Sequence, residues 1–156
     1  MANTYSQIYF QFVFAVKGRK IQIHENLREE VQKYITGIVT NQKNKLLAIY
    51  ANPDHIHILI SYKNLSLSIS QMVKEIKVSS TNFMNGKGFF AEKFYWQEGY
   101  GCFSYSKSQK DEVVKYINNQ REHHEKKSFK HEYLNFLKKF EIDFDEKYVF
   151  EFYDNE

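Results

Sequence analysis

The chain has 156 residues, of which 42% are hydrophobic and 17% aromatic, enough to fill the core of one domain without a disulfide or a structural zinc ion. Its single cysteine, Cys102, excludes a disulfide framework within the chain and favours a reducing compartment. The first residues lack a signal-peptide pattern, and no stretch approaches the ~20 consecutive apolar residues of a membrane span, so we expect a cytoplasmic protein outside the membrane.

The net charge of +3 conceals an uneven distribution of charge. Residues 1–140 carry 21 basic and 12 acidic side chains, whereas residues 141–156 carry seven acidic side chains and Lys147 alone. A basic body suits a polyanionic partner, because Lys and Arg displace the counterions condensed on phosphates. An ordinary solvated surface explains the same charges, so charge alone does not decide between the two.

Segments of strand-like and helix-like character alternate along the chain. The turn signal Asn52-Pro53-Asp54 separates two strands, and Ser66 or Ser68 is expected to cap the second helix. In chain order, the predicted elements are a strand over 5–16, a helix over 25–41, strands over 46–51 and 55–62, a helix ending at 85–88, strand pieces over 94–97 and 100–105, a helix over 108–127 and a helix over 129–140. This alternation predicts an α/β (α+β) sandwich in which helices pack on a small sheet.

The sequence contains no obvious boundary within residues 1–140, because one proline and six scattered glycines leave no linker or low-complexity segment. We therefore expect one domain over this range. Residues 141–156 are acidic and have no clear periodicity. The aromatic residues of this segment predict that it docks on the domain or on a partner subunit.

Two histidines, His55 and His57, flank Ile56 inside a predicted strand. Because side chains alternate along a strand, both imidazoles project from one face while Ile56 and Ile58 enter the core on the other. Two imidazoles side by side suit a divalent cation. The alternative is a pair of histidines that are hydrogen-bonded for structural reasons only.

A second candidate group is the pair Tyr116 and Gln120 on the predicted helix over 108–127. The two residues are four positions apart, so they lie one turn apart on the same face. The amide oxygen of Gln120 is suited to complete a metal site begun by two histidines, with the phenol beside it. A half-buried tyrosine on an amphipathic helix explains the same pattern without chemistry.

The histidine-rich run 121–127 continues that helix. His124 prolongs the ridge of Tyr116 and Gln120, so it is expected to approach the site, whereas His123 is expected to lie to the side. Adjacent helical residues diverge by about 100° and do not easily share one ion. The run as a whole is expected to face solvent or phosphate.

Three segments together resemble the single-tyrosine HUH transposases of the smallest bacterial insertion sequences. They are residues 54–60 (DHIHILI), 96–106 (WQEGYGCFSYS) and 116–124 (YINNQREHH). The resemblance extends from about Tyr5 to the region of Phe140. It implies a ferredoxin-like (RRM-like) fold with a small antiparallel sheet.

The resemblance also implies a role for each matching residue. His55 and His57 correspond to the paired metal ligands, Gln120 to the third protein ligand and Tyr116 to the nucleophile. The family implies Mg²⁺ or Mn²⁺, whereas the softness of imidazole ligands by itself favours Zn²⁺ or Mn²⁺; we expect Mg²⁺ or Mn²⁺ and no nucleotide cofactor. Family members are homodimers in which the tyrosine helix of one subunit can complete the histidine site of the other.

The expected reaction is cleavage and rejoining of single-stranded DNA that carries hairpins at the ends of the element. A phenol has a pKa of about 10 and is a poor nucleophile at neutral pH, so the cation is expected to offset charge on the scissile phosphate. Attack by Tyr116 yields a 5′-phosphotyrosine and a free 3′-hydroxyl. A second 3′-hydroxyl then rejoins strands without ATP.

Contacts with the DNA are harder to assign than the reacting groups. The candidates for phosphate contact are Lys17, Arg19, Lys74 and Lys77, although a solvated surface explains each of them equally well. Trp96 is expected to lie in the core or at a dimer interface rather than to stack on a base.

Three alternative functions share parts of this pattern. The first is an HUH single-strand nuclease that serves the host instead of moving an element. The second is a non-catalytic nucleic-acid-binding module on the same fold, although the chain lacks the aromatic strand signature typical of such modules. The third is a hydrolase that uses His55 and His57 with a water nucleophile and does not need Tyr116.

Overall fold

Four strands form one antiparallel sheet at the centre of the molecule. In the computed structural model, which describes residues 3–153, the strands are β1 (Tyr9–Ala15), β2 (Lys45–Ala51), β3 (His55–Ser61) and β4 (Gly101–Tyr105). Their order across the sheet is β2-β3-β1-β4, so β3 and β1 occupy the centre. Two βαβ-type units with this strand order confirm the predicted ferredoxin-like α+β fold.

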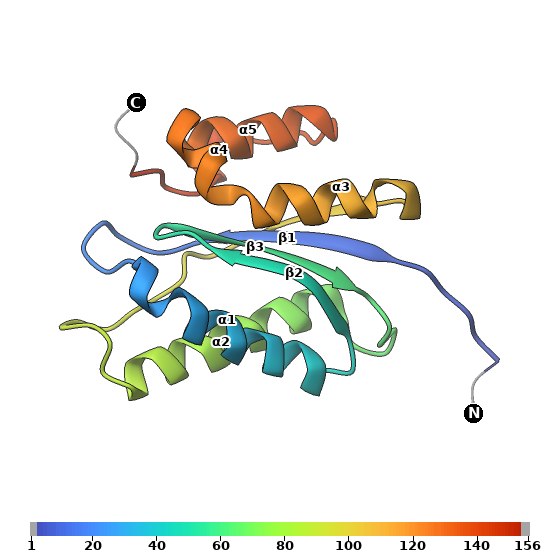
Figure 1. Cartoon of the computed structure of the whole chain (residues 1–156). Helices are drawn as coiled ribbons and strands as arrows, with labels where there is room; N and C mark the ends of the chain where they lie inside the picture. Colours follow the sequence, from blue (N-terminus) through green and yellow to red (C-terminus); the bar gives the residue numbers. More distant parts are fainter. Residues whose placement is uncertain (1–2, 154–156) are drawn as a thin grey trace.

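Helices cover both faces of the sheet (Figure 1). On one face lie α1 (Glu25–Asn41) and α2 (Ile69–Gly86); on the other lie α3 (Lys107–Asn118), α4 (Gln120–Lys126) and α5 (Phe129–Lys139). The sheet is therefore the middle of three layers, and its strands are buried on both sides. Among the described residues, no helix is long and apolar enough to cross a membrane.

The alternation of β3 divides its side chains between the two faces. Ile56, Ile58 and Ile60 enter the core with buried residues of α1 and α2, as predicted. Leu59, on the opposite face, packs against Ile117 and other apolar residues of α3. His55 and His57 share the face of Leu59, so both histidines lie under the layer of α3, α4 and α5.

Several predicted boundaries agree with the structure. The helix over 25–41 is α1, and Ser68 caps α2 by accepting a hydrogen bond from the backbone N–H of Gln71 at 3.1 Å. The strand piece predicted over 94–97 is wrong as a strand: only an isolated bridge joins Trp96 to Val16. The aromatic residues alternate in this segment because Phe94 and Trp96 both point into the core. The segment does not form a continuous series of hydrogen bonds with a neighbouring strand.

The single helix predicted over 108–127 is also wrong, because the chain breaks it in two. α3 begins after Ser106 and ends at Asn118, and α4 begins at Gln120. Asn119 between them has φ −101° and ψ 22°, outside the helical range. Asparagine is a poor helix former because its side chain competes for backbone hydrogen bonds, and two occur together here.

Residues 141–153 follow α5 and return to the domain. Phe150 is buried, with its ring 4.9 Å from the ring of Tyr133. The backbone N–H of Glu151 donates to Gln97 Oε1 at 2.8 Å, and Gln97 Nε2 donates to the Glu151 carbonyl at 2.9 Å. The end of the acidic segment, residues 154–156, lies outside the described residues, and the division at residue 140 stays a prediction.

Candidate active site

The two histidines of β3 lie at the bottom of the candidate site. Neither His55 nor His57 is exposed, and their ring centroids are 5.0 Å apart. His57 is paired with Val13 of β1 and with Tyr50 of β2, so it lies in the interior of the sheet. The backbone at this position is held from both sides, which fixes the direction of the imidazoles.

Tyr116 of α3 and Gln120 of α4 lie over these histidines, in the helical layer that covers this face of the sheet. The Tyr116 ring lies 6.0 Å from the ring of His57, and Gln120 is fully buried. Gln120 Oε1 accepts hydrogen bonds from Asn52 Nδ2 at 3.2 Å and from His124 Nε2 at 3.1 Å. The structure therefore brings all four predicted site residues together within one chain.

Glu132 of α5 stands at the centre of the group, and the sequence analysis missed it. Its Oε1 lies 3.3 Å from His55 Nε2, 3.1 Å from His57 Nε2 and 3.2 Å from His124 Nε2. Its Oε2 accepts hydrogen bonds from the Tyr116 hydroxyl and from Gln120 Nε2. One carboxylate thus joins the three histidines to the predicted nucleophile.

A sequence signal for Glu132 did exist. The buried face of α5 contains Phe129, Tyr133 and Leu137, spaced four residues apart as on one side of a helix. Glu132 lies between the first two on this face and is itself buried. An acid within an apolar stripe is a group that needs a polar or metallic partner.

The break at Asn119 changes where the two histidines of α4 point. His124 does approach the site, and its ring centroid lies 4.6 Å from that of His55. His123, which was predicted to lie to the side, instead stacks on the Tyr116 ring with centroids 4.4 Å apart. A continuous helix would not have placed it there.

Neighbouring groups orient the strand histidines. Asp54 Oδ1 lies 2.7 Å from His55 Nδ1, so a proton on Nδ1 leaves Nε2 free to face the site. Gln11 Nε2 lies 2.8 Å from His57 Nδ1, and Gln11 Oε1 accepts a hydrogen bond from the Tyr105 hydroxyl at 2.7 Å. Asp54 thus fixes His55 from behind as is common for metal-binding histidines, whereas the Gln11 amide donates to His57 Nδ1, so the Nε2 of the neutral His57 ring donates to Glu132 Oε1.

The charges of the site are interdependent. Burial alone would raise the pKa of Glu132, but the histidines around it, His57 foremost, hold that pKa below its usual range. Burial raises the pKa of the Tyr116 phenol, and the nearby Glu132 carboxylate raises it further. The site therefore contains an anionic carboxylate hydrogen-bonded to a protonated phenol.

The donor set fits a divalent metal ion. His55, His57, His124 and Glu132 each offer one ligand atom, and these four atoms lie within 4.8 Å of one another. Imidazole nitrogens and a carboxylate oxygen are ordinary ligands of divalent transition metals. Because three of the four residues are buried, water would not easily replace them as ligands.

A cavity of about 490 Å³ opens beside the nucleophile. Tyr116 and Glu132 line it on the side of the metal-binding group, and Lys126, Lys127 and Lys139 contribute basic side chains. A volume in this range accommodates a small ligand or part of a larger one. The predicted nucleophile is thus reachable from a basic cavity.

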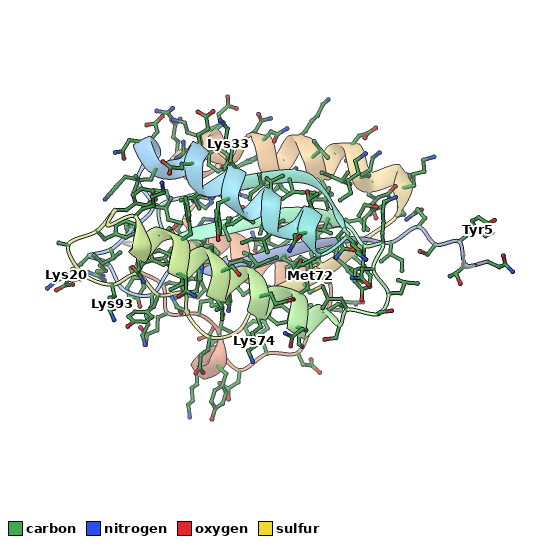
Figure 2. The ribbon with its side chains drawn as sticks, turned by 90° about the horizontal axis from the view of Figure 1, so that it is seen from below. Tyr5, Lys20, Lys33, Met72, Lys74 and Lys93 are labelled. Carbon is green, nitrogen blue, oxygen red and sulfur yellow. The ribbon has the colours of Figure 1, made fainter. Side chains whose placement is uncertain are left out.

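The predicted phosphate contacts do not join the site. Lys74 is exposed on α2, in the layer on the far side of the sheet (Figure 2). Lys77, also on α2, donates hydrogen bonds to the carbonyls of Gln97 at 2.9 Å and Gly99 at 2.6 Å. Lys17 and Arg19 are exposed in the segment between β1 and α1.

Trp96 has a core position. Its side chain is 8% exposed, its Nε1 donates to Ser80 Oγ at 3.0 Å, and its ring meets that of Phe14 edge to face. Both ends of the indole are thus already engaged. This agrees with the expectation of a core role and leaves little of the ring for a base.

Comparisons with known proteins agree with the fold and give a family. A family model described as "Transposase IS200 like" matches residues 4–120. A "putative transposase from Deinococcus radiodurans R1" superposes with a TM-score of 0.61 at 18% identity, over 77% of this chain and 95% of that chain. A REP-associated tyrosine transposase bound to a REP hairpin superposes with a TM-score of 0.58 at 17% identity, over 80% of this chain and 73% of that chain. Among curated proteins, no sequence matches.

Proposed function

The chain belongs to the family of IS200-like transposases, and from this premise we propose that it cuts and rejoins single-stranded DNA with Tyr116 as the nucleophile. The observation that supports the proposal best is the convergence of Tyr116 with His55 and His57 around one carboxylate. These three residues come from a strand and a helix far apart in the sequence. An ordinary core tyrosine would not need two buried imidazoles and an acid around its hydroxyl.

In the proposed reaction Tyr116 attacks the scissile phosphate. A bond forms between the phenolic oxygen and phosphorus, the bond from phosphorus to the 3′-oxygen breaks, and a 5′-phosphotyrosine and a 3′-hydroxyl result. The phenolic proton leaves during attack, where Glu132 Oε2 accepts the hydrogen bond from the hydroxyl, and the departing 3′-oxygen takes up a proton from solvent to become the 3′-hydroxyl. Attack by another 3′-hydroxyl reverses the chemistry and joins strands without ATP, so no nucleotide cofactor is required.

The cation of the proposal is Mg²⁺ or Mn²⁺, held by His55, His57 and Gln120. When bound, it supplies positive charge that offsets the charge developing on the phosphate. The remaining work belongs to the chain: Asp54 and Gln11 orient the two imidazoles, and the buried position of the site excludes competing water.

The proposed substrate is single-stranded DNA with hairpins. One structural relative is bound to a REP hairpin, and we carry a hairpin ligand over to this chain as part of the proposal. Lysines of the cavity beside Tyr116 are suited to the phosphates next to the cleavage point. Lys74 and Lys77 lie in the layer on the other side of the sheet, so any phosphates they bind belong to more distant parts of the DNA. Lys17 and Arg19 are exposed on the segment after β1, which meets β3 where the Val16 N–H donates to the Asp54 carbonyl.

A homodimer in the bacterial cytoplasm completes the proposal. In this chain Tyr116 already reaches the histidines of its own subunit. A dimer therefore brings two complete sites, one for each strand end, and does not require an exchange of the tyrosine helix.

The experiment is an adduct assay with the full chain. A pool of labelled single-stranded hairpin oligonucleotides is incubated with the protein and Mn²⁺, and labelled DNA is expected to migrate with the protein on a denaturing gel. Tyr116→Phe removes the nucleophilic oxygen and should abolish the adduct without loss of hairpin binding. Tyr148→Phe, at an exposed position, is the matched control and should leave the adduct unchanged.

Two outcomes would contradict the proposal. Cleavage at full rate by Tyr116→Phe would show that another group attacks the phosphate. A free 5′-phosphate with no attached protein would point to water as the nucleophile.

A further inference from the structure

Glu132 is placed to hold a metal ion with one oxygen and the nucleophile with the other. Oε1 lies 3.1–3.3 Å from the Nε2 atoms of His55, His57 and His124. Oε2 accepts the hydrogen bond of the Tyr116 hydroxyl. Two of these residues, His124 and Glu132, lie beyond residue 120, where the family match ends.

The distances around Oε1 suit four-coordinate binding. Zinc-to-ligand bonds of about 2.0–2.1 Å place the ligand atoms of a tetrahedral site about 3.3 Å from one another. The three measured distances from Oε1 to imidazole nitrogens, 3.3, 3.1 and 3.2 Å, are close to that edge length. All four ligand atoms lie within 4.8 Å of one another, so the imidazole nitrogens would complete the tetrahedron by drawing together around an ion.

Gln120 is less available as a ligand in this arrangement. Its Oε1 accepts hydrogen bonds from Asn52 and His124, and its Nε2 donates to Glu132. The contacts with Asn52 and Glu132 involve no histidine nitrogen, so they hold the Gln120 side chain in place when His124 Nε2 binds an ion. Gln120 is better placed to orient His124 and Glu132 than to replace either of them.

The chemistry of the four donors selects among metals. Three imidazoles and one carboxylate suit Zn²⁺ and related transition metals, whereas Mg²⁺ prefers six oxygen ligands and keeps several waters. The carboxylate also balances part of the charge of the ion in a site that is almost wholly buried.

We propose that the DNA-free protein binds one transition-metal ion of the Zn²⁺ class through His55, His57, His124 and Glu132, and that Glu132 bridges this ion to the Tyr116 hydroxyl. The inference rests on the proposed function only through the two strand histidines. It replaces Gln120 as the third ligand by two residues of α4 and α5. It also assigns the second carboxylate oxygen to the nucleophile.

The first test measures the affinity of the purified chain for Zn²⁺ by calorimetric or chelator-competition titration. His124→Ala and Glu132→Gln should each weaken binding by about 100-fold, since even loss of a group behind a ligand costs roughly 10–100-fold. Gln120→Ala removes an orienting group and not a ligand, so it should weaken binding by less than either of these two substitutions. The matched controls on α4 are His123→Ala and Glu125→Gln, and neither should weaken binding.

The opposite pattern would overturn the inference. If Gln120→Ala loses the affinity while His124→Ala and Glu132→Gln keep it, the ion is held by the three-ligand set instead. Circular dichroism of each variant separates loss of a ligand from loss of the fold.

A second measurement needs no variant. Co²⁺ replaces Zn²⁺ in tetrahedral sites and then absorbs visible light strongly, whereas six-coordinate Co²⁺ absorbs weakly. The unaltered protein should give the intense four-coordinate spectrum at one equivalent of Co²⁺, and a weak six-coordinate spectrum would overturn the inference. Neither metal test depends on DNA cleavage, so failure here is distinguishable from failure of the adduct assay.

Discussion

The two faces of the central sheet differ in the chemistry that they bury, although the same strand supplies both. On the side of α1 and α2, Ile56, Ile58 and Ile60 of β3 meet apolar side chains. On the side of α3, α4 and α5, His55 and His57 meet a carboxylate and a phenol. Because consecutive residues of β3 point in opposite directions, one face can be selected for packing and the other for reactivity.

This division has a cost on the reactive face. A buried carboxylate stabilises the fold only while its partners are in place, since an unpaired buried charge costs several kcal/mol. Apolar packing on the other face stabilises the fold without needing a charged partner. We therefore expect substitutions on the two faces to affect different properties, and the following predictions test that separation.

The largest expected effect is on catalysis by His57→Ala. Loss of one imidazole removes a metal ligand and should lower the rate of DNA cleavage by at least about 100-fold. The rate is measured with a labelled hairpin oligonucleotide at saturating Mn²⁺. His131→Ala, at an exposed position of α5, is the control; equal rates for the two variants would show that the strand histidines are structural only.

The neighbouring substitution Ile58→Ala tests the other face. Removal of a fully buried isoleucine side chain should lower the free energy of unfolding by about 2–5 kcal/mol. The fraction that remains folded at low temperature should cleave DNA at nearly the normal rate. Urea denaturation gives the stability, and loss of cleavage by the folded fraction would break the proposed separation of the two faces.

Gly101→Ala should disturb the reactive face specifically. A Cβ atom at Gly101 of β4 would lie 2.6 Å from the Tyr133 hydroxyl and 2.9 Å from a carbon of its ring, so the buried Tyr133 side chain must shift, which displaces α5 if the ring has no room to turn, at a cost of about 1–3 kcal/mol. Since Glu132 precedes Tyr133 on α5, metal affinity should fall together with stability.

Gly37→Ala is the matched glycine substitution on the other face. Nothing lies within 4 Å of a Cβ at Gly37 in α1, so this change should raise stability by about 0.5–1 kcal/mol. Thermal melting and Mn²⁺ titration of both variants check the pair. Equal metal affinity in the two would show that the position of α5 does not control the site.

The pH dependence of metal binding tests the charges of the reactive face without any substitution. Burial alone would lower the pKa of His55, but hydrogen bonds to Asp54 and Glu132 raise it from 6.5 to about 9. A metal ion binds the neutral imidazole, so its affinity should rise by up to about tenfold per pH unit below pH 9. Mn²⁺ titrations between pH 7 and 8.5 measure this slope.

The raised pKa of His55 has the opposite effect on the stability of the metal-free protein, which falls as the pH rises. Because the folded pKa of His55 lies above the unfolded value, its proton stabilises the fold fully below pH 6.5, and this contribution is lost as the pH rises towards 9. Metal affinity that stays constant from pH 7 to 8.5 would contradict both statements.

Much of the fold was predictable because its signals are local. The helical spacing over 25–41 and the alternation of β3 each lie within a window of a few residues. For the same reason the pairing of His55 with His57 follows from spacing alone. Tyr116 and Gln120 also come together, but across the break at Asn119 and not on the one helix that their spacing predicted. The break was not predicted, because the low helix propensity of two asparagines is a weak signal that tertiary contacts often override.

The sequence by itself determined most of the elements, the common face of the two histidines, the approach of His124 to the site and the family to which they point. Only the tertiary structure decided that Glu132 joins the histidines, that His123 stacks on Tyr116, and that Lys74 and Lys77 lie on the opposite layer. His57 and Glu132 are 75 positions apart in the chain. A contact of that kind depends on how whole helices pack on the sheet, and no short stretch of sequence specifies it.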